Sequence, residues 1–192
     1  TTLVHQVDPW PRTVQAGPFT IGFVPVSHSI PECSSIVIDT PAGRVVHSAD
    51  FKIDPSPVVG EPFSPETFGE IGAQGVKALV CDSTNVFVEW PGRSEATLAG
   101  PIGELVREAK GMVVATTFAS NVARLKTIAE AGQAAGRSVV VVGRAMKQML
   151  ATARTAEVLD SFPPTLDPQD ALEMPRERLL VLATGSQGER RA

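Results

Sequence analysis

The chain has 192 residues, of which 43% are hydrophobic and 20% are charged, and its net charge is −4. This composition excludes an intrinsically disordered chain and indicates one or two folded domains with apolar cores. No apolar run approaches the roughly 20 residues of a membrane-spanning helix, and the first residues lack a secretion signal. Cys33 and Cys81 are too few for a disulfide scaffold. We therefore expect a cytoplasmic globular protein without a membrane partner.

The first part of the chain consists of short apolar runs separated by turns. Strands are predicted at residues 19–26, 36–39 and 45–49. Pro41, Ala42 and Gly43 separate the second run from the third, which predicts a hairpin. Four prolines exclude regular structure from residues 55–65. After them, the pattern predicts a short helix at residues 65–71 and a compact, buried strand at residues 76–81.

After Trp90 the pattern changes, and we predict a domain boundary between residues 90 and 91. Strands are predicted at residues 112–116, 138–142 and 179–183. Helices are predicted at residues 94–109, with Ser94 as N-cap, 121–135 and 144–155. Gly100 and Pro101 should break or kink the first of these helices. The alternation of strands and helices predicts a parallel, doubly wound α/β sheet in this second part.

A basic segment runs from Arg107 to Arg154, where eight bases face two acids and the net charge is +6. A basic face on an acidic chain fits a phosphate-bearing partner. The alternative for each of these cations is a solvated position on a helix face.

Small and polar residues follow the predicted strands of the second part. They are Ser120 and Asn121, then Gly143 and Arg144, and finally Gly185, Ser186, Gln187 and Gly188. In open α/β sheets, ligands bind at the carboxyl ends of the strands, where small residues let backbone amides approach phosphate. Arg124 and Arg144 each lie near such a turn and are predicted phosphate contacts. Turns rich in Gly and Ser are also common without any ligand.

In the first part, His28 follows one predicted strand and Asp50 follows the hairpin. The hairpin would carry Asp50 back towards His28, so that an imidazole and a carboxylate face a common point. Imidazole and carboxylate groups can both bind zinc, but a catalytic zinc usually has three protein ligands, so such a pair alone would be an incomplete site. Judged by the residues only, His28 is an ordinary loop histidine and Asp82 a turn-forming residue. His47 lies within a strand pattern and is interpreted as structural.

Five strings of the sequence resemble, in this order, the ribonuclease J family, in the β-CASP branch of the metallo-β-lactamase superfamily. They are VPVSHSIPE, HSADFK, CDSTN, FASNVAR and ATGSQGE. The resemblance implies part of a metallo-β-lactamase αββα domain at residues 1–90, followed by an incomplete, Rossmann-like β-CASP domain with a parallel sheet at residues 91–192. Ala49 departs from the family, where glycine is frequent, as does Ala123, where some relatives have histidine.

The resemblance also implies the metal ligands. The family holds two zinc ions with an upstream His-x-His-x-Asp-His motif, a histidine matching His28, a bridging aspartate matching Asp50, and a late histidine. The histidines of this sequence are His5, His28 and His47, so the upstream motif and the late ligand are absent from it. We therefore interpret the chain as an internal fragment with an incomplete site, where zinc or another divalent metal would bind only in the intact enzyme.

The function implied is that of a metal-dependent ribonuclease, a 5′–3′ exonuclease with or without endonuclease activity, in which Asp50 is catalytic. RNA is the expected partner, and a homo-oligomer is expected at full length. The resemblance implies substrate-binding residues at Asp82, Ser83 and Asn85, near the nucleotide and its 5′ phosphate, and at Gly185, Ser186 and Gln187, on the RNA backbone. The other expected RNA contacts are the strand-end residues predicted above from their positions, namely Ser120, Asn121, Arg124 and Arg144. Two alternatives stay open: a non-catalytic RNA- or nucleotide-binding module, and a non-nuclease hydrolase of the metallo-β-lactamase fold.

Overall fold

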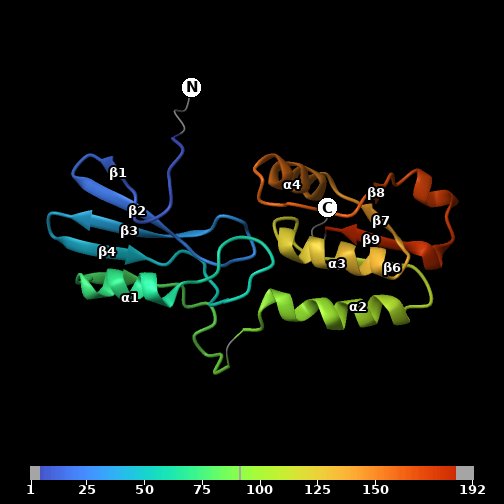
Figure 1. Ribbon diagram of the computed structural model, residues 1–192, viewed down its shortest axis with the longest axis horizontal. Coiled ribbons are helices and arrows are strands. Elements are labelled where there is room, and N and C mark those ends of the chain that lie inside the picture. The colour runs from blue at the N-terminus through green and yellow to red at the C-terminus, as the bar shows by residue number, and fades with distance from the viewer. Residues whose placement is uncertain (1–4, 91, 185–192) are drawn as a thin grey trace. The chain divides into compact units, whose positions relative to one another are not determined.

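The computed structural model describes residues 5–90 and 92–184 and shows a mixed α/β structure, as predicted (Figure 1). It divides into two compact units, with the main division between Arg93 and Ser94. Two short loop segments, Ser29–Pro31 and Ser56–Gly60, belong to the second unit. No helix in the described ranges is long and apolar enough to cross a membrane.

The first unit contains a five-stranded sheet in the order β1-β2-β3-β4-β5. Its strands are β1 (Thr13–Ala16), β2 (Phe19–Pro25), β3 (Ser34–Thr40), β4 (Gly43–His47) and β5 (Ala78–Val80). Neighbouring strands from β1 to β4 are antiparallel, whereas β5 pairs parallel to β4. The predicted strand at residues 19–26 and the predicted hairpin are confirmed. Strand β1 is additional, because its short polar sequence gave no apolar pattern.

Helix α1 (Pro65–Ala73) packs on one face of this sheet. It begins where predicted, because the Ser64 hydroxyl caps it by accepting the Thr67 amide at 3.2 Å. Ile71 of α1 is 2% exposed and packs against one buried valine from each of three strands. These valines are Val24, Val37 and Val46. Because the three strands contribute equally to this core, α1 covers the centre of the sheet.

Strand β5 differs from its prediction. It has three residues, and Leu79 and Val80 are 62% and 51% exposed. The apolar composition of residues 76–81 suggested burial, but β5 is the end strand of the sheet and lies beyond the part that α1 covers. The prediction of a buried strand is therefore wrong for the described structure.

The second unit contains a four-stranded parallel sheet in the order β6-β9-β7-β8. Its strands are β6 (Val113–Thr116), β7 (Ser138–Val141), β8 (Thr165–Leu166) and β9 (Leu179–Ala183). This confirms the predicted parallel sheet, and β9, the last strand in sequence, lies between β6 and β7. Strand β8 is too short to give a sequence pattern. Since all four strands are parallel, their carboxyl ends lie along one edge.

Four helical segments lead into or connect these strands. They are the 3₁₀ helix η1 (Glu95–Leu98), α2 (Ala99–Glu108), α3 (Val122–Ala134) and α4 (Arg144–Thr155). Pro101 does not break α2, because it lies in the first turn, where backbone amides have no intrahelical partner. The predicted break at Gly100 and Pro101 is therefore wrong. The helix instead changes from 3₁₀ to α between Leu98 and Ala99. Two further 3₁₀ turns, η2 (Asp170–Glu173) and η3 (Arg176–Arg178), precede β9.

The core of the second unit lies between the sheet and helices α3 and α4, with α2 packed on α3 (Figure 1). Apolar residues recur along one face of α3, as predicted, and Leu125 is fully buried. Met146 of α4 and Leu180 and Leu182 of β9 are equally inaccessible. Each such side chain contributes about 1.5–3 kcal/mol when buried. This packing holds the strand-end turns in place.

Candidate functional site

The carboxyl ends of β2, β4 and β5 lie at one edge of the first sheet. Strands β2 and β4 run in the same direction because both are antiparallel to β3, and β5 is parallel to β4. The segments that follow these strands carry His28, Asp50 and Asp82, respectively. All three residues therefore come from the same edge.

A backbone hydrogen bond joins the first two of these segments. The Lys52 amide donates to the Ser27 carbonyl oxygen at 2.8 Å. Ser27 precedes His28, and Lys52 lies two positions after Asp50, so the connection brings both predicted ligands to the same region. The hairpin thus returns Asp50 towards His28, as its sequence predicted.

Asp82 is held as a carboxylate at this edge. The pKa of its carboxyl group is lowered chiefly by the Thr84 hydroxyl, which donates to Oδ1 at 2.6 Å, and also by the Thr84 amide at 2.9 Å. His28 lowers this pKa further through its charge. The imidazole and the Asp82 carboxylate are therefore close enough to interact.

The Cys33 thiol also belongs to this region. Its pKa is raised mainly by burial and additionally by the negative charge of Asp50. The thiol consequently keeps its proton at neutral pH.

Ser48 joins the ends of β4 and β5 and was not identified from the sequence. It is 7% exposed; its amide donates to the Val80 carbonyl at 2.8 Å, and its hydroxyl accepts the Asp82 amide at 2.8 Å. The same hydroxyl donates to the Ala49 carbonyl at 2.7 Å, and the Ser35 hydroxyl donates to the Ser48 carbonyl at 2.6 Å. Ser48 therefore positions the segments of Asp50 and Asp82. The sequence signal that could have identified Ser48 is a small polar residue directly after a strand and two positions before Asp50.

Ala49 has a φ of 53°, in the left-handed region that favours glycine. We expect Ala49→Gly to raise the free energy of unfolding by about 0.5–1 kcal/mol, because removing Cβ relieves roughly 1–2 kcal/mol of strain and adds some chain entropy to the unfolded state. Urea unfolding of both proteins measures the difference. Ala42→Gly, in a turn outside the left-handed region, is the control and should be neutral or destabilising. A loss of stability in Ala49→Gly would contradict the expectation.

His28 and Asp50 do not form a complete metal centre on their own. Within residues 5–90 and 92–184, no group of three or more His, Cys, Asp or Glu residues is placed to hold a metal ion. One imidazole and one carboxylate fall short of the three protein ligands typical of a catalytic zinc. The residues present therefore do not fit a complete zinc site.

Ser83 and Asn85 lie beyond Asp82 in the same turn. The Ser83 carbonyl accepts the Val86 amide at 3.1 Å, and the Asn85 carbonyl accepts the Val88 amide at 2.9 Å. Their backbones shape the turn that follows β5, and both residues are exposed at the edge of the first sheet from which the segments of His28 and Asp50 also leave.

The second unit brings its predicted turns to one edge as well. The Thr117 amide donates to the Ala183 carbonyl at 3.4 Å, and the Val142 amide donates to the Leu182 carbonyl at 2.8 Å, so the ends of β6, β9 and β7 are joined. Ser120 and Asn121 follow β6. The Asn121 side chain caps α3 by accepting the Arg124 amide at 3.0 Å. Gly185, Ser186 and Gln187 lie outside the described residues.

Arg124 is engaged by an acidic residue of its own unit. Its guanidinium makes two hydrogen bonds to the Glu95 carboxylate, one of them from Nη2 to Oε2 at 3.1 Å. Glu95 raises the pKa of Arg124 through these bonds. A phosphate at Arg124 would have to compete with Glu95, which gives this residue a structural role beside the predicted one.

Arg137 does not belong to a solvated basic face. It is 8% exposed, and its guanidinium donates to the carbonyls of Gly111 at 2.7 Å, Leu179 at 3.4 Å and Ala109. It thereby links the chain before β6 to the start of β9. The predicted basic face between Arg107 and Arg154 therefore does not include Arg137.

Among the described residues, Arg144 and Lys147 are exposed cations at the carboxyl edge of the second sheet. With Gly143 and Gln148 they line a shallow hollow at the first turns of α4. Gly143 has a φ of 109°, and a Cβ there would lie 3.0 Å from the Thr184 hydroxyl. Glycine therefore allows the ends of β7 and β9 to approach each other where α4 begins.

Comparisons with known proteins agree with this architecture. A family model described as "Ribonuclease J, beta-CASP domain" matches residues 110–192. The chain is 42% identical to ribonuclease J of Sinorhizobium meliloti, covering 93% of the chain and 32% of the relative. It is 37% identical to that of Corynebacterium glutamicum, covering 90% and 24%, and 34% identical to that of Thermus thermophilus, covering 97% and 32%. The chain thus spans a third or less of the length of these relatives.

The fold is also similar to a solved structure, a protein of unknown function from Enterococcus faecalis V583. The TM-score is 0.60 at 16% sequence identity, and the match covers 96% of this chain and 45% of that one. This likeness concerns the fold alone. The family model and the sequence identities carry the assignment: the chain matches a part of ribonuclease J, and residues 110–192 match its β-CASP domain, in the metallo-β-lactamase superfamily.

Proposed function

We propose that this chain is part of a ribonuclease that hydrolyses RNA phosphodiesters. The observation that carries the proposal is that the segments of His28, Asp50 and Asp82 leave the same sheet edge, in a chain similar to ribonuclease J. An imidazole and a carboxylate are suitable ligands for a divalent metal, and Asp82 with Ser83 would lie beside the terminal nucleotide.

The metal site is proposed to be shared with residues outside this chain. His28 and Asp50 would contribute two ligands, and other residues would complete a site for two zinc or other divalent ions. Such ions lower the pKa of a bound water and neutralise charge on a phosphodiester. In this chain, Ser48 fixes the segment from which Asp50 projects. A 5′–3′ exonuclease mode, with or without internal cleavage, belongs to the same proposal.

The test is RNA cleavage by a longer protein that includes this chain. We expect it to degrade 5′-monophosphorylated RNA, and we expect a chelator to abolish the activity and added zinc or manganese to restore it. Sequencing gels of RNA labelled at either end distinguish release from the 5′ end from internal cuts. Full activity in the chelator would remove the metal from the proposal, and absence of any RNA cleavage with every metal would overturn the function.

The chain by itself is proposed to bind RNA without cleaving it, because Arg144 and Lys147 lie exposed at the carboxyl edge of the second sheet. We expect Arg144→Ala to weaken binding of a single-stranded RNA and to reduce the slope of log affinity against log salt by about 0.7, the value for one phosphate contact. Fluorescence anisotropy at several salt concentrations measures both quantities.

The control for this measurement is Arg107→Ala, which removes an exposed positive charge from α2. It should leave the salt dependence unchanged. Equal effects of the two substitutions would indicate a diffuse charge effect and would contradict a contact at the strand edge. Arg137 is unsuitable as a control, because its guanidinium is buried.

A further inference from the structure

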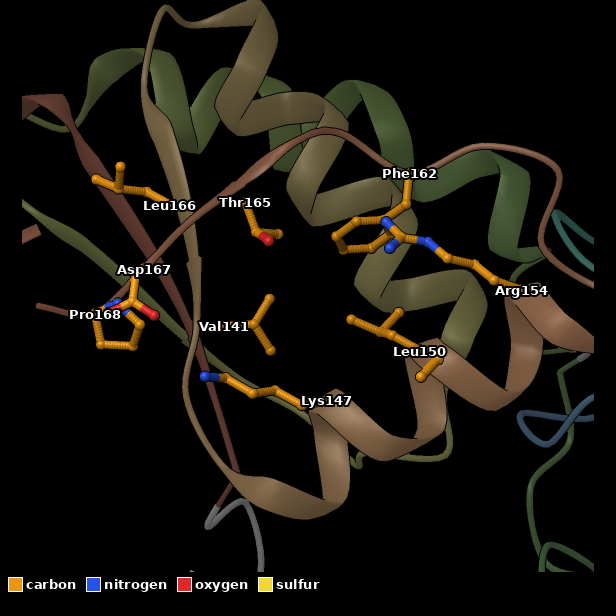
Figure 2. Close-up of a pocket in the computed structure, with 10 residues that line it drawn as sticks. Val141, Lys147, Leu150, Arg154, Phe162, Thr165, Leu166, Asp167 and Pro168 are labelled. Atoms are coloured by element: carbon orange, nitrogen blue, oxygen red, sulfur yellow. The ribbon is translucent and has the colours of Figure 1, made fainter. Parts of the chain in front are cut away.

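A pocket of about 330 Å³ lies within the second unit, between α4 and the segment that contains β8 (Figure 2). Its floor is apolar and is formed by Val141 of β7 and Leu150 of α4, and Thr165 of β8 lies beside them (Figure 2). The volume is at the lower end of the range of roughly 300–1,000 Å³ for small-molecule sites. The pocket therefore suits a ligand with a small apolar body.

The two ends of the pocket differ in chemistry. Figure 2 shows Arg154 and Phe162 at one end and Asp167 and Pro168 at the other. The guanidinium carbon of Arg154 lies over the Phe162 ring, 5.6 Å from its centre, so the guanidinium covers one face of the ring and is the planar group at this end. Planar rings of nucleobases stack on both aromatic side chains and guanidinium groups.

At the other end, Asp167 offers a fixed acceptor. Its Oδ1 accepts the Gln169 amide at 2.9 Å, which holds the carboxylate in place. Carboxylates accept hydrogen bonds from the amino groups of nucleobases, such as N4 of cytosine. Uracil has no amino group. A base in this pocket would therefore be selected by its amino group.

Cations connect the pocket with the adjoining hollow at the start of α4. Lys147 lines both, and Arg144 lines the hollow. Lys147 and Arg154 lie two turns apart along α4, on the side that faces β8. Backbone amides in the first turn of a helix favour anions as well. An anionic group attached to the apolar body would lie near Lys147 and Arg144.

We propose that this pocket binds one nucleotide, with its base on the apolar floor beside Phe162 and Arg154 and its phosphate at Lys147 and Arg144. Cytosine is preferred over uracil because of Asp167. That the nucleotide belongs to an RNA strand rests on the proposed function, whereas recognition of the nucleotide itself does not. A free mononucleotide has the same chemistry and is the alternative source.

The test is an NMR titration of the ¹⁵N-labelled chain with CMP, with UMP and with a short oligocytidylate. We expect saturable shifts of the amides of α4 and β8, and binding of CMP about tenfold tighter than that of UMP. Asp167→Asn should remove the preference for CMP. Lys147→Ala should weaken CMP binding about tenfold, since it removes a charged hydrogen-bond donor. The spectra of the variants also report whether they are folded.

Lys110→Ala is the matched control, because it removes an equal charge just before β6, at the opposite edge of the sheet. It should change the affinity less than about twofold, within the usual effect of an exposed charge. Absence of saturable shifts around the pocket, or equal losses in Lys147→Ala and Lys110→Ala, would overturn the site. Binding of CMP without binding of oligocytidylate would overturn RNA as the source. RNA cleavage by the longer protein is measured separately, so the two proposals fail independently.

Discussion

Replacing Asp50 by asparagine is expected to reduce RNA cleavage by the longer protein on the order of 10³-fold, because metal-assisted charge stabilisation supplies several kcal/mol of the barrier reduction. The amide keeps the size of the carboxylate but removes its charge. Asp50 is exposed at the end of the β4 segment, so folding should be little affected. The initial rate on 5′-monophosphorylated RNA at saturating metal measures the loss.

Asp160→Asn is the control for this prediction, since it removes an equal charge from an exposed position of the second unit. It should retain the parent rate. His28→Ala is expected to act in the same direction as Asp50→Asn. If Asp50→Asn cleaved RNA at a rate near that of the parent, Asp50 would not be a ligand of the reacting centre. The description of the fold would still hold.

Replacing Arg137 by alanine is expected to lower the free energy of unfolding of the second unit by about 3 kcal/mol. The substitution removes hydrogen bonds to three carbonyls, and a buried acceptor without a partner costs about 1–3 kcal/mol. Arg137→Lys should recover only part of this loss, because one ammonium group cannot reproduce the guanidinium geometry. Far-UV circular dichroism during urea unfolding reports mainly on the second unit, because this unit contains α2, α3 and α4, whereas the first unit contains only α1 among the described α-helices.

The two tryptophans allow the effect to be localised. Trp10 and Trp90 both belong to the first unit, so their fluorescence follows that unit. Arg107→Ala, at an exposed position of α2, should change stability by less than about 0.5 kcal/mol. An Arg137→Ala variant as stable as Arg107→Ala would show that the three carbonyls find other partners.

The sequence by itself determined the local elements and the region of the candidate site. Helices α3 and α4 and the β3–β4 hairpin follow from local signals, namely apolar periodicity, the Asn121 cap and the turn after Thr40. Polar residues that follow strands were assigned to a sheet edge by a general rule of strand direction. These signals act over a few residues, so the chain order is sufficient to show them.

The tertiary structure alone decided which cations are exposed and how the strands are ordered. Arg124, Arg137 and Arg144 lie in one basic segment, yet the first pairs with Glu95, the second is buried against carbonyls, and the third lies at the surface. The partners of Arg124 and Arg137 lie 26 to 42 residues away, beyond the reach of any local pattern. The same holds for β9 between β6 and β7, and for the exposure of β5. Burial and pairing depend on contacts between distant segments, and these exist only after the chain has folded.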